Sequence, residues 1–227
     1  YGENGAIVHY HALPETCATV QAKGLLLVDS GAQYLDGTTD ITRTYAMGEL
    51  TREEKEYYTT VLKTHISVAR TIFLDGTSGS TLDMMARSKV WSKGIDYRHG
   101  TGHGVGYFGG VHEGPHNLRT TSTVPFHAGM LITDEPGYYE EGKVGIRIEN
   151  ILLVKKLFEN EYGTFLGYEP VTYCPIDTTP VLVEQLDDEE IAWLNEYHRT
   201  VYEKLAGCLE EDERAWLKEK TTPISKK

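Results

Sequence analysis

The sequence lacks several features that mark whole classes of proteins. No apolar run approaches the roughly 18 residues of a membrane span, and no signal peptide is visible. Positive charge is scarce, because 22 Lys and Arg stand against 34 Asp and Glu and give a formal net charge of −12. These absences argue against binding to a membrane or to nucleic acid. They favour a soluble, cytoplasmic protein or one that concentrates cations.

Cysteine is rare and scattered. Cys17, Cys174 and Cys208 form no CxxC pair, and an odd number leaves one thiol unpaired in any disulfide scheme. Reduced thiols in a reducing compartment are the simplest interpretation. Because no partner histidine is suggested for any of them, we expect packing residues rather than catalytic nucleophiles.

The chain is long enough for one large domain or two small ones, since 40% of its 227 residues are hydrophobic. No repeat, low-complexity tract or linker divides it. We predict one α+β domain over residues 1–227. Because the chain begins at Tyr1 rather than Met, in an apparent strand, we expect it to be a piece of a longer protein.

Local patterns predict both strands and helices. Strands are expected over residues 5–12, 24–34 and 40–47, and strands with hairpins over 97–155. A first helix begins with a capping box, in which Thr51 is the N-cap and Glu54 reaches back. Its apolar face has spacings of three and four and consists of Tyr58, Val61, Leu62, His65, Ala69 and Ile72.

Two further helices are expected, one from Ser80 to near Gly94 and one from Asp187. The last dozen residues are charged, and we expect them to fray.

Asp29 ends an apolar strand, and Asp40 follows eleven residues later. A tight turn at Asp36-Gly37 would leave the two side chains on one face but about 13 Å apart at the usual strand rise. They can meet only if the connection is wider or bulged, which Gly31 would permit.

Glu135 and Glu149 form a second acidic pair around Gly142. A hairpin centred on that glycine places them directly opposite each other, with Cβ atoms about 5 Å apart. Between the two acidic pairs lies the histidine-rich segment HGTGHGVGYFGGVHEGPH, residues 99–116.

Four carboxylates in one pocket would repel each other and raise their pKa values. Two divalent cations remove this repulsion, because four positive charges balance four negative ones. Oxygen-rich sites with one imidazole suit Mn²⁺, with Zn²⁺ or Co²⁺ as alternatives. Two such ions can share a hydroxide that is nucleophilic near neutral pH.

Each residue alone also has an ordinary explanation. An aspartate at a strand end is usually a turn former, and the histidines fit polar positions in a glycine-rich loop. By default His11, His65, His127 and His198 are structural. The GxGxxG match at residues 104–109 follows no clear strand and opens no helix, so a dinucleotide site is not expected. The joint pattern of acids and histidines favours a metal site.

The motifs GAIVHYHALPET, DSGAQYLDGTTDITRT, HGTGHGVG, VHEGPH, EPGYYEEGKVGIRIEN and EIAWLNEYH occur in this order along almost the whole chain. In these motifs the sequence resembles the pita-bread metallopeptidases, and among them the aminopeptidase P (Xaa-Pro aminopeptidase) family. The resemblance implies a curved antiparallel sheet flanked by helices and a dinuclear metal site.

The resemblance also implies the ligands of the two metals. Asp29 matches a bidentate ligand of one ion, and Asp40 and Glu149 match carboxylates that bridge both. His103 and Glu135 match the remaining ligands of the second ion.

Other residues match positions around the metals. His9 and His112 match histidines that hold the substrate and stabilise the tetrahedral intermediate, and His99 matches one that lines the pocket. The glutamate at the position of Glu135 also handles protons. Arg147 is expected to orient the Asp29 carboxylate by hydrogen bonding.

The implied reaction is hydrolysis of the peptide bond before a proline in second position, with peptides as substrates. Family members carry further domains before the catalytic one, so we expect those domains to be missing here and the fragment to have weak or no activity. Residues 170–227 match a C-terminal extension packed on the catalytic domain, and homodimers are possible.

Three other functions remain open. A prolidase or a methionine aminopeptidase shares the pita-bread fold and differs in substrate. A catalytically silent pita-bread module would bind peptides or proteins, but such relatives lose metal ligands. An acidic scaffold would leave the carboxylates solvated on the surface.

Overall fold

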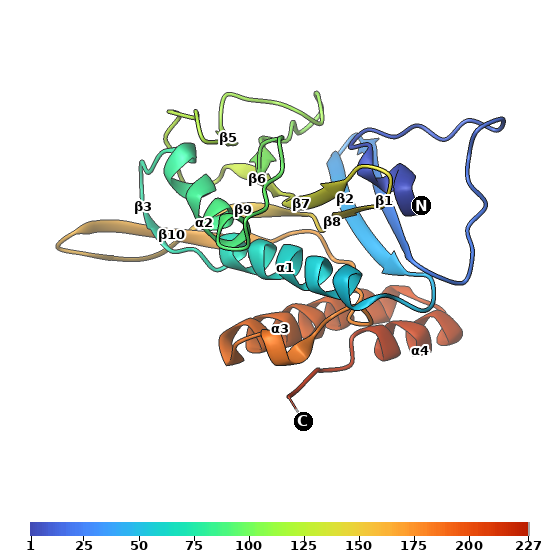
Figure 1. The fold of residues 1–227 in the computed structure, drawn as a ribbon. Helices are drawn as coiled ribbons and strands as arrows, with labels where there is room; N and C mark the ends of the chain where they lie inside the picture. Colours follow the sequence, from blue (N-terminus) through green and yellow to red (C-terminus); the bar gives the residue numbers. More distant parts are fainter. Residues whose placement is uncertain (227) are drawn as a thin grey trace.

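Antiparallel strands form one side of the molecule and helices cover the other (Figure 1). The computed structural model describes residues 1–226. The strands are β1 (Leu25–Tyr34), β2 (Gly37–Ala46), β3 (Phe73–Leu74), β4 (Gly102–His103), β5 (Asn117–Leu118), β6 (Leu131–Asp134), β7 (Gly137–Glu140), β8 (Val144–Arg147), β9 (Asn150–Asn160) and β10 (Gly163–Pro170). The helices are α1 (Arg52–Ala69), α2 (Gly79–Trp91), α3 (Asp188–Leu205) and α4 (Glu211–Lys220), with short 3-10 helices η1 (Gly2–Ala6), η2 (Val183–Gln185) and η3 (Ala206–Cys208).

The ladders between these strands are antiparallel. β1 pairs with β2, β4 with β5 and β7 with β8, and a four-stranded sheet has the order β3-β10-β9-β6. Contacts of β8 with β1 and β2, and an isolated bridge between Gly104 and Ile132, join the ladders into one curled surface. This mixture is the predicted α+β fold class.

Two apolar cores hold the helices to the strands. The first lies between α1, β8 and α3, so that α1 is enclosed between the strands and the C-terminal helices (Figure 1). The second packs α2 against β6, β9 and β10. Full burial of one large apolar side chain contributes about 1.5–3 kcal/mol, so the cores supply most of the driving force for this arrangement.

The predicted strand at residues 5–12 is wrong. Residues Gly2–Ala6 form η1 instead, and Gly2 has a φ of 56°, which favours glycine. A Cβ on Gly5 would lie 3.1 Å from the backbone N of Gly145, so this segment stacks closely on β8. Close stacking of a turn, rather than strand pairing, therefore places the first residues.

The connection between β1 and β2 also differs from the prediction. Tyr34 pairs with Gly37, so the turn is a tight two-residue one at Leu35-Asp36 and the strands pair without a bulge. This register sets Asp29 opposite Thr42 and Asp40 opposite Gly31. The turn lies one residue earlier than expected, and that shift alone brings the two aspartates within reach.

The helices follow the sequence patterns with small shifts. The capping box at Thr51 and Glu54 is confirmed, but α1 ends at Ala69, and Ile72 is 57% exposed. Ser78 rather than Ser80 is the N-cap of α2. The helix expected from Asp187 is confirmed as α3.

The expectation that the last dozen residues fray is wrong up to Lys220. Glu210 and Glu213 form another capping box, and Leu217 of α4 is buried. The cysteines are free thiols, but Cys17 and Cys208 are exposed and so are not packing residues.

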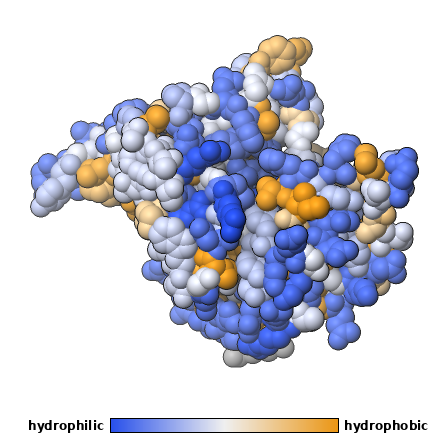
Figure 2. Space-filling view, turned by 45° about the horizontal axis from the view of Figure 1, so that its top comes forward, coloured by the Kyte–Doolittle hydropathy of each residue, from blue (hydrophilic) through white to orange (hydrophobic). Residues whose placement is uncertain are grey.

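The surface shown in Figure 2 is mostly hydrophilic, with apolar side chains in small separate groups. The long β9–β10 hairpin projects beyond the body at the left of Figure 1. Within residues 1–226, no helix is both long and apolar enough to cross a membrane.

Candidate metal centre

A cavity of about 640 Å³ lies where the strand ends and the residue 104–113 loop meet. All nine residues singled out from the sequence line this cavity: His9, Asp29, Asp40, His99, His103, His112, Glu135, Arg147 and Glu149. The sequence patterns therefore point to one place in the fold, although they come from distant parts of the chain.

The β1–β2 ladder brings the aspartates together. Residues opposite each other in an antiparallel pair share a face, as do residues two apart in a strand. Asp29 is opposite Thr42, and Asp40 is two residues from Thr42, so all three side chains point to the cavity side. Ligand oxygens of Asp29, Asp40 and Glu149 lie within 4.8 Å of one another.

The β7–β8 hairpin brings the glutamates together. Its register pairs Gly137 with Arg147, and the same alignment continued outward places Glu135 opposite Glu149, as predicted. Ligand atoms of His103, Glu135 and Glu149 lie within 4.8 Å of one another. Glu149 thus belongs to two groups of candidate ligands.

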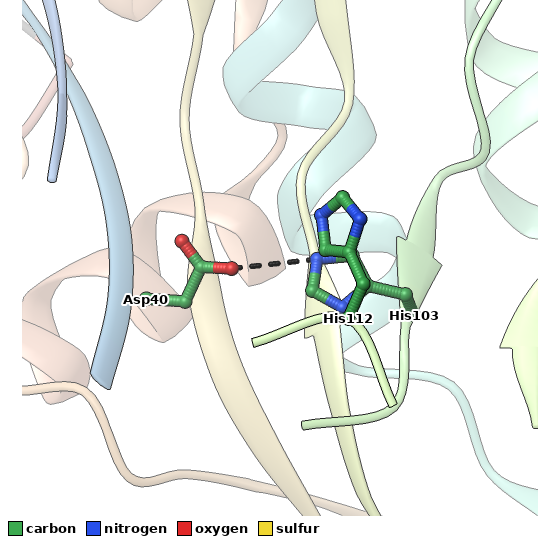
Figure 3. Close-up of side chains that lie close together, drawn as sticks. All are labelled: Asp40, His103 and His112. Atoms are coloured by element: carbon green, nitrogen blue, oxygen red, sulfur yellow. Dashed lines mark ion pairs between the residues drawn. The ribbon is translucent and has the colours of Figure 1, made fainter. Parts of the chain in front are cut away.

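His103 lies between the two acidic pairs. Its Nε2 is 3.3 Å from Asp40 Oδ2 and 3.3 Å from Glu135 Oε1. The His112 ring lies beside it, with ring centroids 3.9 Å apart. Figure 3 shows that Asp40, His103 and His112 point toward one another, and their ligand atoms also lie within 4.8 Å.

Burial and mutual repulsion shift the acid pKa values upward. Burial, with the charges of Glu135 and Asp40, raises the pKa of Glu149 well above its ordinary value. Burial also raises the pKa of Glu135 to about 7. Burial alone would lower the pKa of His103, but its hydrogen bond to Asp40 and the nearby Glu135 raise it.

Cations fit this cluster. Without them the carboxyl groups must stay protonated or repel each other, and both conditions cost free energy. Carboxylate oxygens with one or two imidazoles are a donor set that divalent first-row metals accept. The residues present therefore suit a metal site.

Neutral and cationic side chains hold the acids in place. Arg147 Nη2 donates to Asp29 Oδ2 at 2.6 Å, which is the contact expected from the sequence. Arg147 Nε also donates to Thr42 Oγ1, whose hydroxyl in turn donates to Glu149 Oε2 at 2.6 Å. The sequence reasoning missed Thr42, although its position two residues from Asp40 places it on the same face.

The remaining histidines have clear surroundings. His99 Nε2 lies 2.9 Å from the Tyr139 hydroxyl, and burial lowers the His99 pKa to about 4. His9 reaches the cavity from the segment after η1. His65 and His198 are buried in the fold, where Asp134 pairs with His65 and His198 Nε2 accepts from the Ile176 N–H.

The sequence reasoning also missed Arg119. Arg119 lines the cavity, and its side chain lies against Gly100, where an added Cβ would be 2.7 Å from Arg119 Nε. A glycine in the HGTGHG motif therefore makes room for a cation at the cavity wall.

The burial of the cluster argues against the acidic scaffold. The Glu149 side chain is buried, those of Asp40, His103 and Glu135 are largely shielded, and the exposed Asp29 is bound by Arg147. Solvated surface carboxylates would show neither feature.

Residues 1–156 match the model of metallopeptidase family M24, and residues 164–224 match the model of the C-terminal region of peptidase M24. The chain belongs to metallopeptidase family M24. This membership agrees with the resemblance seen in the motifs. The predicted pita-bread fold, a curled antiparallel sheet with flanking helices, is confirmed by solved structures of similar M24 proteins.

Several characterised M24 proteins are similar to the chain. It is 46% identical over 231 residues to the probable Xaa-Pro aminopeptidase P of Coprinopsis cinerea, covering 98% of this chain and 37% of that protein. It is 48% identical to aminopeptidase P2 of Arabidopsis thaliana, covering 99% of this chain and 32% of the relative. The chain thus spans about a third of the length of these relatives.

Solved M24 structures give the same picture. X-prolyl aminopeptidase from Caenorhabditis elegans, described as a cytosolic enzyme with a di-nuclear active site, matches with a TM-score of 0.94 and 40% identity over 98% of this chain and 37% of that one. Prolidase from Pyrococcus furiosus matches with a TM-score of 0.65 and 29% identity over 76% of this chain and 47% of that one.

Proposed function

We propose that this M24 chain is the catalytic part of a metal-dependent aminopeptidase that hydrolyses the N-terminal Xaa-Pro peptide bond. The observation that carries the proposal is the convergence of five candidate ligands in one cavity. Identities of 46–48% with aminopeptidases P support the substrate class.

The proposed metal ligands are Asp29, Asp40, His103, Glu135 and Glu149. Glu149 belongs to two candidate ligand groups and Asp40 to two as well, which suits carboxylates that two ions share. When bound, two divalent cations supply Lewis acidity and a shared hydroxide as nucleophile. We propose Mn²⁺ first, with Zn²⁺ or Co²⁺ as alternatives.

The residues around the ligands orient the substrate and move protons. Glu135 takes the proton of the attacking water and returns it to the proline nitrogen, which has no N–H of its own and leaves only when protonated. The imidazole of His112, beside His103, donates to the developing oxyanion. His9 and His99 hold the peptide along the cavity wall, and Arg147 keeps Asp29 oriented.

The arrangement of the whole protein is part of the same proposal. Residues 1–227 form one catalytic domain, on which residues 170–227 pack as an extension. The protein acts in the cytoplasm on peptides, as a monomer or a homodimer. A prolidase activity is the alternative, because prolidases and dipeptidases of 28–31% identity share the fold.

The test is hydrolysis of the tripeptide Arg-Pro-Pro by the 227-residue chain with and without Mn²⁺. We expect Mn²⁺-dependent release of arginine and two metal ions per chain by elemental analysis. Asp40→Asn should lower the rate by more than about 100-fold, since it removes a shared ligand. Asp36→Asn, in the exposed β1–β2 turn, is the matched control and should not change the rate.

The possible outcomes separate the candidate functions. Cleavage of the dipeptide Arg-Pro but not of Arg-Pro-Pro would favour the prolidase. Two bound metals with no cleavage of either peptide would favour the silent module. A chain that retains no divalent ion at micromolar concentration would overturn the metal site itself.

A further inference from the structure

Residues 104–113 form a loop between β4 and β5, and this glycine loop carries His112 to the cavity. Apolar packing holds little of it, because Tyr107 and Phe108 at its tip are each 68% exposed. A loop of this kind needs polar contacts to keep one conformation.

Glu113 supplies such contacts from inside the loop. Its Oε2 accepts a hydrogen bond from the Gly110 N–H at 3.1 Å, and its own N–H donates to the Gly104 carbonyl at 2.8 Å. A Cβ added at Gly106 would lie 2.1 Å from Glu113 Oε2, and one added at Gly109 would lie 2.0 Å from it. The carboxylate therefore fills the space that side chains at these two glycines would take.

The glycine loop is also tied to the strands that carry the aspartates. Gln33 Nε2 of β1 donates to the Gly109 carbonyl, and Thr38 Oγ1 of β2 donates to the Tyr107 carbonyl at 3.5 Å. Both contacts are made by the exposed part of the loop that Glu113 braces. The loop conformation thus links Glu113 to the position of His112 beside His103.

We infer that Glu113 is a positioning residue, whose carboxylate braces the glycine loop and keeps the His112 imidazole against His103 and Asp40. Among the residues that the structure describes, those lining the cavity include Val111 and His112 but not Glu113. Glu113 therefore acts through the loop and not by contact with a substrate. Its importance for catalysis rests on the function proposed above, whereas its effect on His112 does not.

The glycines offer a second way to remove the brace. At Gly109 the three nearest atoms to an added Cβ all belong to the Glu113 side chain, and the backbone φ is not in the region reserved for glycine. Gly109→Ala should displace the carboxylate without a clash with backbone. It should therefore have the same effect as Glu113→Ala.

The first test uses the metal-free chain and needs no activity. The ¹⁵N–¹H signals of the His112 imidazole are assigned by their loss in His112→Ala. In Glu113→Ala and in Gly109→Ala we expect these signals to shift and broaden, whereas Glu113→Gln, whose amide oxygen still accepts from Gly110, should restore them. Unchanged His112 signals in Glu113→Ala would overturn the inference, whether or not the chain is a peptidase.

The second test is a double-mutant cycle on Arg-Pro-Pro hydrolysis. Glu113→Ala and Gly109→Ala should each lower kcat by about 10-fold with KM within about twofold, since a displaced catalytic group loses rate rather than binding. The double variant should lose no more than either single one, and Glu113→Ala in a His112→Ala background should add nothing. Independent, multiplying losses in either pair would overturn the inference.

Two control variants match these changes elsewhere on the surface. Glu161→Ala removes an exposed glutamate at the β9–β10 turn, and Gly207→Ala adds a methyl group where nothing lies within 4 Å. Both should leave the His112 signals and kcat unchanged. Absence of hydrolysis by the unmodified chain would count against the proposed function alone, because the spectra decide the role of Glu113.

Discussion

Buried acids dominate the chemistry of the candidate metal centre at the scale of single residues. Glu135 and Glu149 lie out of water beside Asp40, and their pKa values are raised by burial first. Arg147 offsets part of this charge but is already bound to Asp29 and to the Tyr139 hydroxyl. The metal-free protein therefore contains a local electrostatic cost that metal binding removes.

This cost predicts how Glu135 affects stability at different pH values. Its pKa is about 7 in the folded chain, against an ordinary value of 4.5, so between these values the folded state holds a proton that the unfolded state has lost. The contribution of Glu135 to the free energy of unfolding therefore falls as pH rises through this window. In metal-free protein, Glu135→Gln should be nearly neutral at pH 5 and stabilising by roughly 1–3 kcal/mol at pH 8.

Urea unfolding in EDTA at both pH values measures the effect. Comparison with the variant isolates Glu135 from His99, whose lowered pKa changes stability in the opposite direction. Addition of Mn²⁺ should reverse the order at pH 8, because the variant lacks a ligand. A difference between the two proteins that stays constant from pH 5 to pH 8 would contradict the prediction.

At the scale of elements, α2 supports the segment that contains His99 and His103. Arg87 donates through Nη2 to the His99 carbonyl at 2.6 Å and binds Asp83 one turn earlier. Asp83 is fully buried and accepts from the Thr101 hydroxyl, while the Thr101 carbonyl accepts from the Glu135 N–H at 2.8 Å. The helix thus reaches two candidate ligands without touching the cavity.

Asp83→Asn tests this support. Loss of the buried charge beside Arg87 should destabilise the chain by about 2–4 kcal/mol, and the loosened segment should weaken Mn²⁺ binding by roughly 10–100-fold. Thermal melting and calorimetric titration with Mn²⁺ provide the two measurements. Asp96→Asn is the control, since Asp96 binds the same arginine from a half-exposed position. A destabilised variant with unchanged Mn²⁺ affinity would limit α2 to a structural role.

Some elements could be predicted from sequence because their signals are local. The capping boxes at Thr51 and Asp187 depend on residues three apart, and both helices begin where these boxes place them. The β1–β2 register depends on where one turn falls, and a shift of one residue separated the expected 13 Å gap from the close pair that forms. Thr42 was overlooked because a threonine within a strand is an ordinary residue until its partners are known.

At the scale of the whole molecule, the C-terminal region is bound to the back of the metal centre. Arg43 of β2 points away from the cavity and donates to the Glu149 carbonyl at 2.5 Å, to Asn150 Oδ1 and to the Cys174 and Pro175 carbonyls. The hydroxyl of Tyr197, on α3, accepts from the same guanidinium at 2.9 Å. No sequence pattern pointed to this contact, because its partners lie more than 100 residues apart.

Tyr197→Phe measures the strength of this connection. Removal of the buried hydroxyl leaves Arg43 with one acceptor fewer, so we expect a loss of about 1–3 kcal/mol in the free energy of unfolding and a smaller fall in Mn²⁺ affinity. Tyr202→Phe, at a partly buried position on the same helix, is the control and should change both values little. Equal effects of the two variants in urea unfolding would show that Tyr197 contributes by packing alone.

The alternation of side chains along β2 has a consequence for how the chain tolerates changes in length. Asp40 and Thr42 face the cavity while Arg43 faces the opposite side, so one extra or missing amino acid within this ribbon would exchange the two faces. A single-codon insertion there would be worse than most point mutations. Among natural homologues, length variation should instead accumulate in the exposed stretch from residue 10 to residue 22 and at the tip of the projecting β9–β10 hairpin.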